Sequence, residues 1–403
     1  MRVWVNEDDM LEFGFLEIFM KDLFAHARSQ GGAFRGIFAA LSLVMVLVTF
    51  AAVPGGAGAA TSQTPGLNCS ALASSTPSVS PATAVPLPEI PAVNVPDGAT
   101  KVLVGYLPLS IYAPLYVAYE KGYYAQEGLD VTLQSFTNGT DMTVLTATNK
   151  LNIGLTGIGP AYWNAVSQKL PLKIIAPGHS EGSPVASPLM ISKKACEDGS
   201  IESVADLKGK KVSVNAPGAT ELWLEKALET GGLKIGDVDL QYLTFPDAVT
   251  ALDSGALDAA IIGEPIATKA EQDGLAVRLL SDFPVQGIWP TMVFGNENWL
   301  TSNPEAAVGF VRAYLKASND LNTNFNDPLN LAIINKYTKV PADLIAESVK
   351  PKYSTDGSID LASLNQLQTF FGSRDLLDYD TPLHPASLVD TQYVEKAREG
   401  SGS

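Results

Sequence analysis

The chain has 403 residues, with 43 acidic against 27 basic side chains and a formal net charge of −16 at pH 7. Because nucleic-acid phosphates are bound by clustered Lys and Arg, this balance argues against a nucleic-acid partner. Two cysteines are too few for a disulfide scaffold or a zinc site, and the length is enough for two domains with a sizeable core.

The first 59 residues have the pattern of an export signal or a membrane anchor. An apolar, uncharged run (Ile37–Val53) follows two arginines, and the small residues at 57–59 fit the A-x-A cleavage pattern. The run is close to the minimum length of a membrane-spanning helix, so cleavage and a retained anchor both stay open. Acidic residues before Met20 are unusual in a signal, and translation from Met20 would give a better one.

Residues 60–98 are rich in Ser, Thr, Pro and Ala and poor in bulky apolar residues. They cannot bury enough surface to fold, so we expect a disordered tether, and we expect a flexible tail at 391–403. The "GLN" before Cys69 lacks the small residue normally found beside a lipidated cysteine, which favours an ordinary cysteine. Its only possible disulfide partner in the chain is Cys196, and whether the two pair stays open.

From about Thr100 the sequence becomes a series of short apolar runs that alternate with amphipathic stretches. Strands are expected at "KVLVGYLP", "LDVTLQSF", "LNIGLTGIG" and "LKIIAPG", with helices at "APLYVAYEKGYYAQEG", "DMTVLTATNK" and "PAYWNAVSQ". Strands that are continuous apolar runs and alternate with helices predict a parallel sheet that is covered on both faces.

The same pattern starts again further along the chain. "SVADLKGKKVSVNAPGATELWLEKALETGGL" predicts a strand, a turn and a helix, followed by strands at "VDLQYLTF", "LDAAIIGEP" and "RLLSD" and a helix at "PDAVTALDSG". Mainly helices follow. In "SNPEAAVGFVRAYLKASNDL" we expect Asn303 at the N-cap and Pro304 in the first turn. "PADLIAESV" and "DLASLNQLQTFFGS" predict helices that return to cover the first lobe.

This arrangement predicts two α/β lobes joined by two chain crossings, near Ser187–Ser192 and near Pro284–Thr291. Lobe 1 comprises residues 99–188 and 291–390, and lobe 2 comprises residues 189–290. Two lobes with two crossings make a hinged clamshell. Ligands in such folds lie outside the carboxyl ends of the parallel strands, which here face the cleft.

Five strand-to-helix junctions carry Gly, Ser, Thr or Asn. Small residues let backbone amides approach a ligand, and a helix N-terminus adds a favourable partial positive charge. One such junction means little, because turns need these residues anyway, but five in one two-lobed pattern predict a binding cleft. The junctions are Leu107–Pro114, Thr137–Asp141, Thr156–Pro160, Gly178–Ser183 and Asn215–Glu221.

The chain carries little indication of catalysis and no metal-binding motif. "GHSEG" (178–182) matches the letters of G-x-S-x-G, but there is no H-E-x-x-H and no set of paired metal ligands. Ser110, Ser180 and Ser183 are candidate nucleophiles, but His179 beside Ser180 is better explained as a polar wall of the cleft than as a general base. Glu264 ends a strand and either accepts hydrogen bonds from a ligand or faces water. We therefore expect a binding protein rather than an enzyme, with no cofactor.

The charges and rings near the junctions bear on the kind of ligand. Between Arg35 and Arg278 there is no arginine. Because arginine often clamps carboxylate, phosphate or sulfonate groups, its absence disfavours a strongly anionic ligand. Aromatic rings are plentiful at the junctions and offer flat faces for stacking. Tyr112, Trp163 and Trp289 are the best candidates for the walls of the cleft.

Five segments together resemble the substrate-binding proteins of ABC importers. They are "VGYLPLSIYAPLYVAYEKGYYAQEGLDVTL", "LNIGLTGIGPAYWNAV", "DLKGKKVSVNAPGATELWLEKAL", "DAVTALDSGALDAAIIGEP" and "NPEAAVGFVRAYLKA". The resemblance covers Lys101–Ser373 and is closest to the subgroup for sulfonates, nitrate, thiamine pyrimidine precursors and riboflavin. It implies an α/β, two-lobed periplasmic-binding-protein fold of type II with two hinge crossings.

The resemblance implies an exported monomer, periplasmic or at the cell surface, that is associated with the membrane through its N-terminal anchor or its permease. It would capture a small molecule and deliver it to an ABC permease with a cytoplasmic ATPase.

The aromatic, arginine-free cleft looks closest to the branch for heterocyclic vitamins, with riboflavin first and a thiamine pyrimidine precursor second. A binder of a sulfonate, nitrate or similar anion is the alternative. The thiamine-pyrimidine synthase of eukaryotes shares the fold, but it is cytoplasmic and has a cysteine-rich signature, so an enzyme is a remote alternative.

Carried onto this sequence, the resemblance places ring contacts at the three aromatic residues named above, and closure would depend on ligand contacts with both lobes. The polar contacts fall on Ser110, Asn138, Thr156, His179, Asn215, Thr220 and Glu264.

Overall fold

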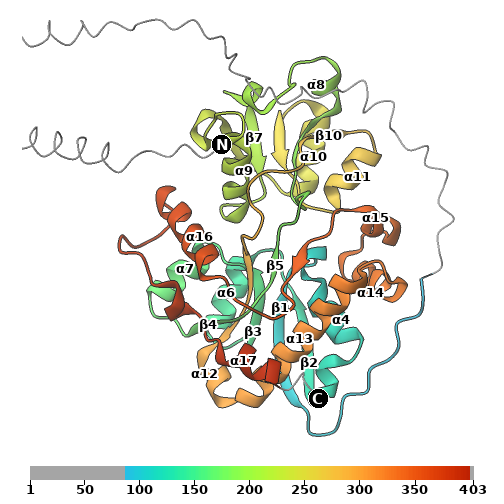
Figure 1. Ribbon diagram of the computed structural model, residues 1–403, viewed down its shortest axis with the longest axis vertical. Coiled ribbons are helices and arrows are strands. Elements are labelled where there is room, and N and C mark those ends of the chain that lie inside the picture. Colours follow the sequence, from blue (N-terminus) through green and yellow to red (C-terminus); the bar gives the residue numbers. More distant parts are fainter. Residues whose placement is uncertain (1–86, 400–403) are drawn as a thin grey trace, which may run out of the picture. The chain divides into compact units, whose positions relative to one another are not determined.

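The computed structural model describes residues 87–399 (Figure 1). The expected signal or anchor, Met20, Cys69 and most of the expected tether lie outside the described residues and stay predictions. The flexible tail expected at 391–403 is wrong for Gln392–Glu399, which form a helix with three buried residues that packs on the longer helix at Pro304–Asn324. Cys196 is disulfide-bonded, and the sequence holds one other cysteine. Within 87–399, no helix is both long enough and apolar enough to cross a membrane.

Lobe 1 contains a five-stranded sheet in the order β2-β1-β3-β11-β4. β1 pairs in parallel with β2 and β3, whereas β11 runs antiparallel to both β3 and β4. The strands are β1 (Thr100–Tyr106), β2 (Leu129–Ser135), β3 (Ile153–Gly157), β4 (Leu172–Pro177) and β11 (Thr291–Asn296).

Lobe 2 contains a second five-stranded sheet in the order β10-β6-β9-β7-β8. β7 pairs in parallel with β8 and β9, whereas β6 runs antiparallel to β9 and β10. The strands are β6 (Leu189–Ser192), β7 (Lys211–Val214), β8 (Asp239–Tyr242), β9 (Ala259–Ile261) and β10 (Ala276–Leu280).

The sheets are therefore mixed, and the expectation of wholly parallel sheets is wrong for β6 and β11. Each of these two is the first strand of its sheet after the chain crosses from the other lobe. A strand that enters from the opposite lobe runs against its neighbours. Its buried apolar run looks the same in either direction, so hydrophobicity alone does not reveal the reversal.

Helices cover both sheets, and side chains cap the start of α6, α8 and α10. In α6 the side chain of Asn138 accepts a hydrogen bond from the Asp141 amide, and Thr244 caps α10 in the same way. α10 ends at Gly255, whose φ of 74° is the left-handed conformation that glycine adopts without strain. These helices are α4 (Ala113–Glu120), α5 (Tyr123–Gln126), α6 (Gly139–Ala147), α7 (Pro160–Ser167), α8 (Lys193–Glu197), α9 (Ala219–Glu229), α10 (Phe245–Ser254) and α11 (Ile266–Gln272).

The chain after β11 is mainly helical. The longest helix within residues 87–399, α13, begins after Asn303 with Pro304 in its first turn, as expected, but the Asn303 side chain donates to the carbonyl of Trp299 rather than capping α13. A two-residue strand, β12, pairs antiparallel with an equally short β5 (His179–Ser180) next to the first crossing. The C-terminal elements are α12 (Glu297–Ser302), α13 (Pro304–Asn324), α14 (Pro328–Thr338), α15 (Ala342–Glu347), β12 (Lys352–Tyr353), α16 (Leu361–Ser373) and α17 (Gln392–Glu399).

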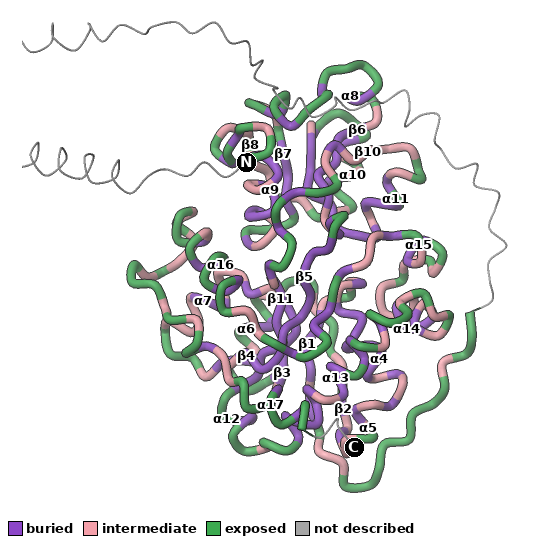
Figure 2. Tube along the Cα trace, in the orientation of Figure 1, coloured by how far each residue is buried: buried purple, intermediate pink, exposed green. Residues whose placement is uncertain are grey.

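The core follows the sheets, whose central strands are buried while the edge strands β2 and β8 and the outer faces of the helices are partly exposed (Figure 2). One hydrophobic cluster joins β1 and α4 to α13 in lobe 1. A second extends from β4 and α7 of lobe 1 through α16 to α9 and the sheet of lobe 2. The lobes therefore share a continuous apolar contact in addition to the two crossings.

Candidate ligand-binding site

A group of buried polar residues lies at the carboxyl ends of the lobe 1 strands. We call Ser110, Tyr112, Thr156, His179, Thr291 and Tyr353 the lobe 1 polar cluster; each is at most 5% exposed. The Tyr112 hydroxyl, at the start of α4, bonds to the side chain of Thr156 and the backbone of Gly157 at the end of β3. Gly157 in turn pairs with Thr291, the first residue of β11.

His179 connects the two sides of this cluster. The Thr291 hydroxyl oxygen accepts the His179 backbone N–H at 2.8 Å and lies 2.7 Å from its Nδ1. Burial lowers the pKa of His179 to about 3, so the imidazole is neutral at physiological pH. A Cβ at Gly178 would lie 2.2 Å from the Thr291 hydroxyl, so this close approach requires glycine.

Tyr353 closes the cluster from the C-terminal part of the chain. It pairs with His179 across β5 and β12, so the two side chains lie on the same face of the ribbon. Its hydroxyl donates to the Ser110 carbonyl at 3.2 Å, while the Ser110 hydroxyl is buried and has no partner in the described residues. Ser110, Tyr112, Thr156 and His179 are therefore brought together.

In lobe 2, the Thr220 hydroxyl donates to Asn215 Oδ1 at 2.7 Å at the junction of β7 and α9. Glu264 follows β9, the neighbour of β7, so both positions lie at the same edge of the sheet. Glu264 Oε1 accepts from Arg278 at 2.7 Å, and Oε2 accepts the Thr268 amide at 3.1 Å. Its carboxylate is therefore already satisfied within lobe 2.

The remaining predicted residues lie apart from the polar cluster. Asn138 is exposed and caps α6. Trp163 is fully buried in the apolar cluster that joins the lobes, and its Nε1 has no partner in the described residues. Trp289 is half-buried in the second crossing, and its backbone N–H donates to the Ser363 hydroxyl at 3.2 Å.

Sequence reasoning missed Thr291, Tyr353 and a third buried polar residue, Glu181. The Glu181 carboxylate accepts from Trp223 Nε1 at 2.8 Å and from the Ala186 amide at 2.5 Å, and burial raises its pKa. It therefore ties the first crossing to α9 of lobe 2. Thr291 carried a weak signal, because it lies at the second crossing, but nothing near Tyr353 indicates that it reaches residue 110.

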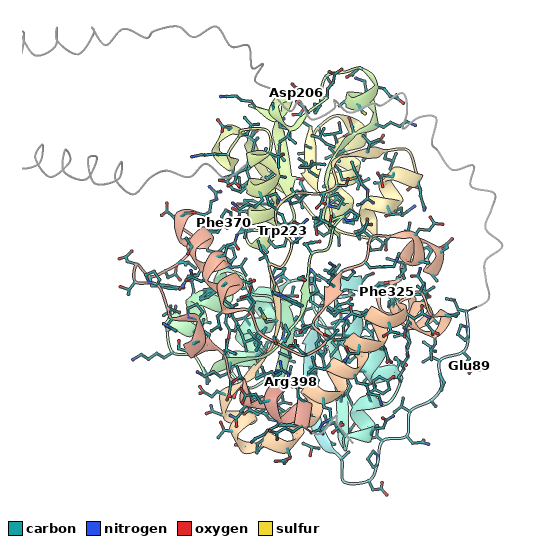
Figure 3. The ribbon with its side chains drawn as sticks, viewed as in Figure 1. Glu89, Asp206, Trp223, Phe325, Phe370 and Arg398 are labelled. Carbon is teal, nitrogen blue, oxygen red and sulfur yellow. The ribbon has the colours of Figure 1, made fainter. Side chains whose placement is uncertain are left out.

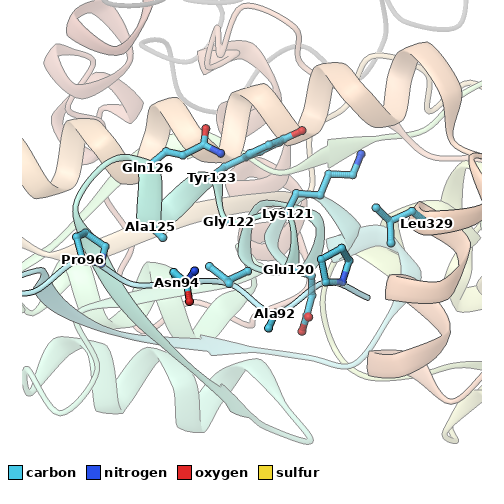
Figure 4. Close-up of a pocket in the computed structure, with 12 residues that line it drawn as sticks. Ala92, Asn94, Pro96, Glu120, Lys121, Gly122, Tyr123, Ala125, Gln126 and Leu329 are labelled. Atoms are coloured by element: carbon cyan, nitrogen blue, oxygen red, sulfur yellow. The ribbon is translucent and has the colours of Figure 1, made fainter. Parts of the chain in front are cut away.

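A groove of about 650 Å³ lies elsewhere on lobe 1, between residues 91–96 and the α4–α5 turn (Figure 4). It is at the C-terminal end of α4, whereas the polar cluster is at the N-terminal end. Two of its polar side chains are satisfied by other residues: Glu120 pairs with Lys336, and Lys121 pairs with Asp320. The groove is therefore separate from the candidate site.

Comparison with known proteins identifies the family. Residues 110–324, more than half of the chain, match the profile described as NMT1/THI5 like. The chain belongs to this family. The chain is 26% identical to the nitrate/nitrite binding protein NrtA of Nostoc sp., over 71% of this chain and 68% of that protein. It is 27% identical to the riboflavin-binding protein RibY of Chloroflexus aurantiacus, over 66% of this chain and 73% of that protein.

Solved structures confirm the two-lobed α/β fold expected for periplasmic binding proteins. The periplasmic aliphatic sulphonate binding protein SsuA of Escherichia coli matches 72% of this chain and 92% of its own, with a TM-score of 0.60 and 20% identity. The desulfurization enzyme DSZB has the same fold, with a TM-score of 0.58 and 15% identity. The fold therefore hosts both binding proteins and an enzyme, and the site must distinguish between them.

Proposed function

We propose that this protein is the exported substrate-binding component of an ABC importer and captures a small, uncharged heteroaromatic molecule. Riboflavin is the first candidate and a thiamine pyrimidine precursor the second. The protein acts outside the cytoplasmic membrane as a monomer and delivers its ligand to a permease with a cytoplasmic ATPase. No catalytic step is part of the proposal.

The observation that carries this proposal is the chemistry of the lobe 1 polar cluster. The cluster presents five hydroxyls, one from a serine, two from threonines and two from tyrosines, together with the neutral imidazole of His179. Hydroxyls and neutral imidazole both donate and accept hydrogen bonds, as the edge of a neutral heterocycle requires. No charged side chain belongs to the cluster.

Arg278 and Arg374 are already paired, and the half-buried Lys350, which interacts electrostatically with Glu264, donates to three backbone carbonyls. Arg278 is bound to Glu264 and Glu271, both at 2.7 Å, and Arg374 is bound to Glu221 at 3.0 Å. Lys352 is exposed, but it follows the strand alternation and points to the face opposite Tyr353, away from the cluster. These paired charges favour a neutral ligand over an anion.

Anion binding is the second candidate, and two features favour it. The first turns of α6 and α9 contain residues that are only half-buried, and helix N-termini hold anions through their free amides. The similarity to NrtA and SsuA adds weight, because nitrate and sulfonates are what those proteins bind by name. The two candidates differ in ligand charge, so one ligand panel distinguishes them.

The test is thermal unfolding of the full chain with riboflavin, thiamine pyrimidine precursors, taurine, alkanesulfonates and nitrate. A ligand at 100 times its Kd adds about 2.7 kcal/mol to the free energy of unfolding, which raises Tm by about 3–4 °C for a protein of this size. We expect this shift with a vitamin-type ligand. A shift with a sulfonate or nitrate, and with neither vitamin class, would contradict the proposed ligand.

A site variant adds a second arm to this test. Ser110→Ala removes a hydroxyl that has no partner in the described residues, so it breaks no hydrogen bond in the free protein. If the ligand bonds to this hydroxyl, the variant binds about tenfold more weakly with unchanged stability. Ser254→Ala, at an exposed position of α10 in lobe 2, is the matched control and should bind normally.

A further inference from the structure

The C-terminal part of the chain crosses the hinge and contacts lobe 2 at two places. α15 contacts α11 of lobe 2, β12 pairs with β5 beside the first crossing, and α16 contacts both α7 of lobe 1 and α9 of lobe 2. Figure 1 shows α15 and α16 on opposite sides of the two crossings. Residues 342–374 therefore form a crossbar, which is a third connection between the lobes.

The α16 end of the crossbar contacts lobe 2 through an ion pair whose carboxylate is buried and whose arginine is half-buried. Glu221, in the first turn of α9, is 0% exposed. Its Oε2 accepts from Arg374 Nε at 3.0 Å, and its Oε1 accepts from the Tyr242 hydroxyl at 2.8 Å. Arg374 follows α16 in the C-terminal segment, so the charge that neutralises this lobe 2 carboxylate comes from outside lobe 2. A buried carboxylate without its partner is strongly unfavourable.

Apolar contacts reinforce the ion pair. Leu364, Leu367 and Phe371 of α16 are fully buried in the same cluster as Leu222 and Trp223 of α9. Figure 3 labels Trp223 and Phe370, which lie on these two neighbouring helices. The Ser363 hydroxyl also accepts the Trp289 amide of the second crossing. α16 is therefore fixed to lobe 2, to the hinge and, through α7, to lobe 1.

The α15 end of the crossbar makes a much weaker contact. Gln272 of α11 donates a hydrogen bond to Glu347 of α15, between two exposed side chains, and Lys350, which follows α15, interacts electrostatically with Glu264 of lobe 2. Exposed polar pairs contribute little, because water replaces them at small cost. The α16 end, with its apolar contacts and the ion pair to Glu221, therefore resists separation of the lobes more strongly than the α15 end.

We propose that α16 and the Arg374–Glu221 pair form a latch that holds the two lobes in their present orientation without a ligand. The latch shifts the equilibrium between lobe orientations before any ligand binds. A ligand then has to supply less of the free energy that keeps the lobes together. The proposal does not depend on which ligand the cleft takes.

The test measures the distance between the lobes in the full chain without ligand. Nitroxide labels are placed at Gln168→Cys in lobe 1 and Asp253→Cys in lobe 2, both exposed positions. Cys196 is disulfide-bonded and does not react with the label. Double electron–electron resonance between the two labels should give one narrow distance peak for the parent chain. For Arg374→Gln it should give a broader peak at a longer mean distance.

Gln272→Ala, which breaks the contact at the other end of the crossbar, is the matched control and should keep the narrow peak. Should Arg374→Gln lose its folded circular dichroism spectrum, Glu221→Gln serves instead, because it keeps the shape and the Tyr242 contact but removes the charge. An unchanged peak in the folded latch variant, or the same broadening in Gln272→Ala, would overturn the latch. Ligand identity affects neither outcome, so failure here is distinct from failure of the proposed function.

Discussion

At the scale of single residues, His179 shows how burial sets the charge of the candidate site. Its pKa of about 3 compares with about 6.5 in an unfolded chain. The unfolded state therefore binds more protons than the folded state between these two values. In this window the free energy of unfolding rises with pH, and it falls as the pH drops below 6.5.

We expect this residue to make the folded chain sensitive to mild acid. Between pH 7 and pH 5 the parent chain should lose about 2 kcal/mol more of its unfolding free energy than His179→Gln, which stays neutral and can still bond to Thr291. Urea unfolding at both pH values measures the difference. His384→Gln, at an exposed position, should behave like the parent. Equal losses in the parent and His179→Gln would show that the imidazole is not held neutral.

The sequence predicted part of this site because strand ends obey a geometric rule. Ser110, Tyr112 and Thr156 follow or end neighbouring strands, whose carboxyl ends meet at one edge of the sheet. Thr291 lies 112 residues from His179, and Tyr353 lies 243 residues from Ser110. No local pattern encodes contacts of this range, so these two partners emerge only when the chain is folded.

At the scale of elements, α6 is held against β3 by a glycine. A Cβ at Gly139 would lie 2.4 Å from the Thr156 hydroxyl, whereas one at Gly159, which precedes α7, would have nothing within 4 Å. Neither glycine has a positive φ, so alanine is conformationally allowed at both positions. The two positions therefore form a matched pair that differs only in the space available to an added Cβ atom.

Gly139→Ala should push the start of α6 away from β3. We expect it to lower the free energy of unfolding by about 1–3 kcal/mol, the usual cost of overpacking. Gly159→Ala should change it by less than about 0.5 kcal/mol. Urea unfolding of both variants checks this prediction, and an undisturbed Gly139→Ala would mean that α6 and β3 are not in close contact.

Elements were predicted well where they are long and periodic, and poorly where they are short. α13 was expected because its apolar face repeats along five turns of helix. β5 and β12 have two residues each, too few for any alternation to be detectable. The crossbar therefore could not be predicted, although the helix at α16 was expected.

At the scale of the whole molecule, the two lobes were predictable because the strand–helix pattern occurs twice. All strands of the second sheet fall within residues 189–290. The extent of contact between the lobes was not predictable. It depends on α16 contacting lobe 2, and an amphipathic sequence indicates that a face is buried without indicating the surface against which it lies.

The net charge of −16 and the paired arginines together predict how binding depends on salt. A neutral heterocycle held by hydroxyls and a neutral imidazole forms no ion pair, so screening has little to act on. We expect the Kd of riboflavin to vary by less than about twofold between roughly 50 and 500 mM sodium chloride. The change in riboflavin fluorescence on binding measures this Kd.

A nitrate or sulfonate would instead bind more weakly as salt increases, because chloride screens its attraction to the protein and competes for the same backbone amides. Sodium fluoride and sodium chloride compared at equal ionic strength separate screening from competition. Severalfold weaker riboflavin binding at high salt would show that an unpaired charge takes part in the site.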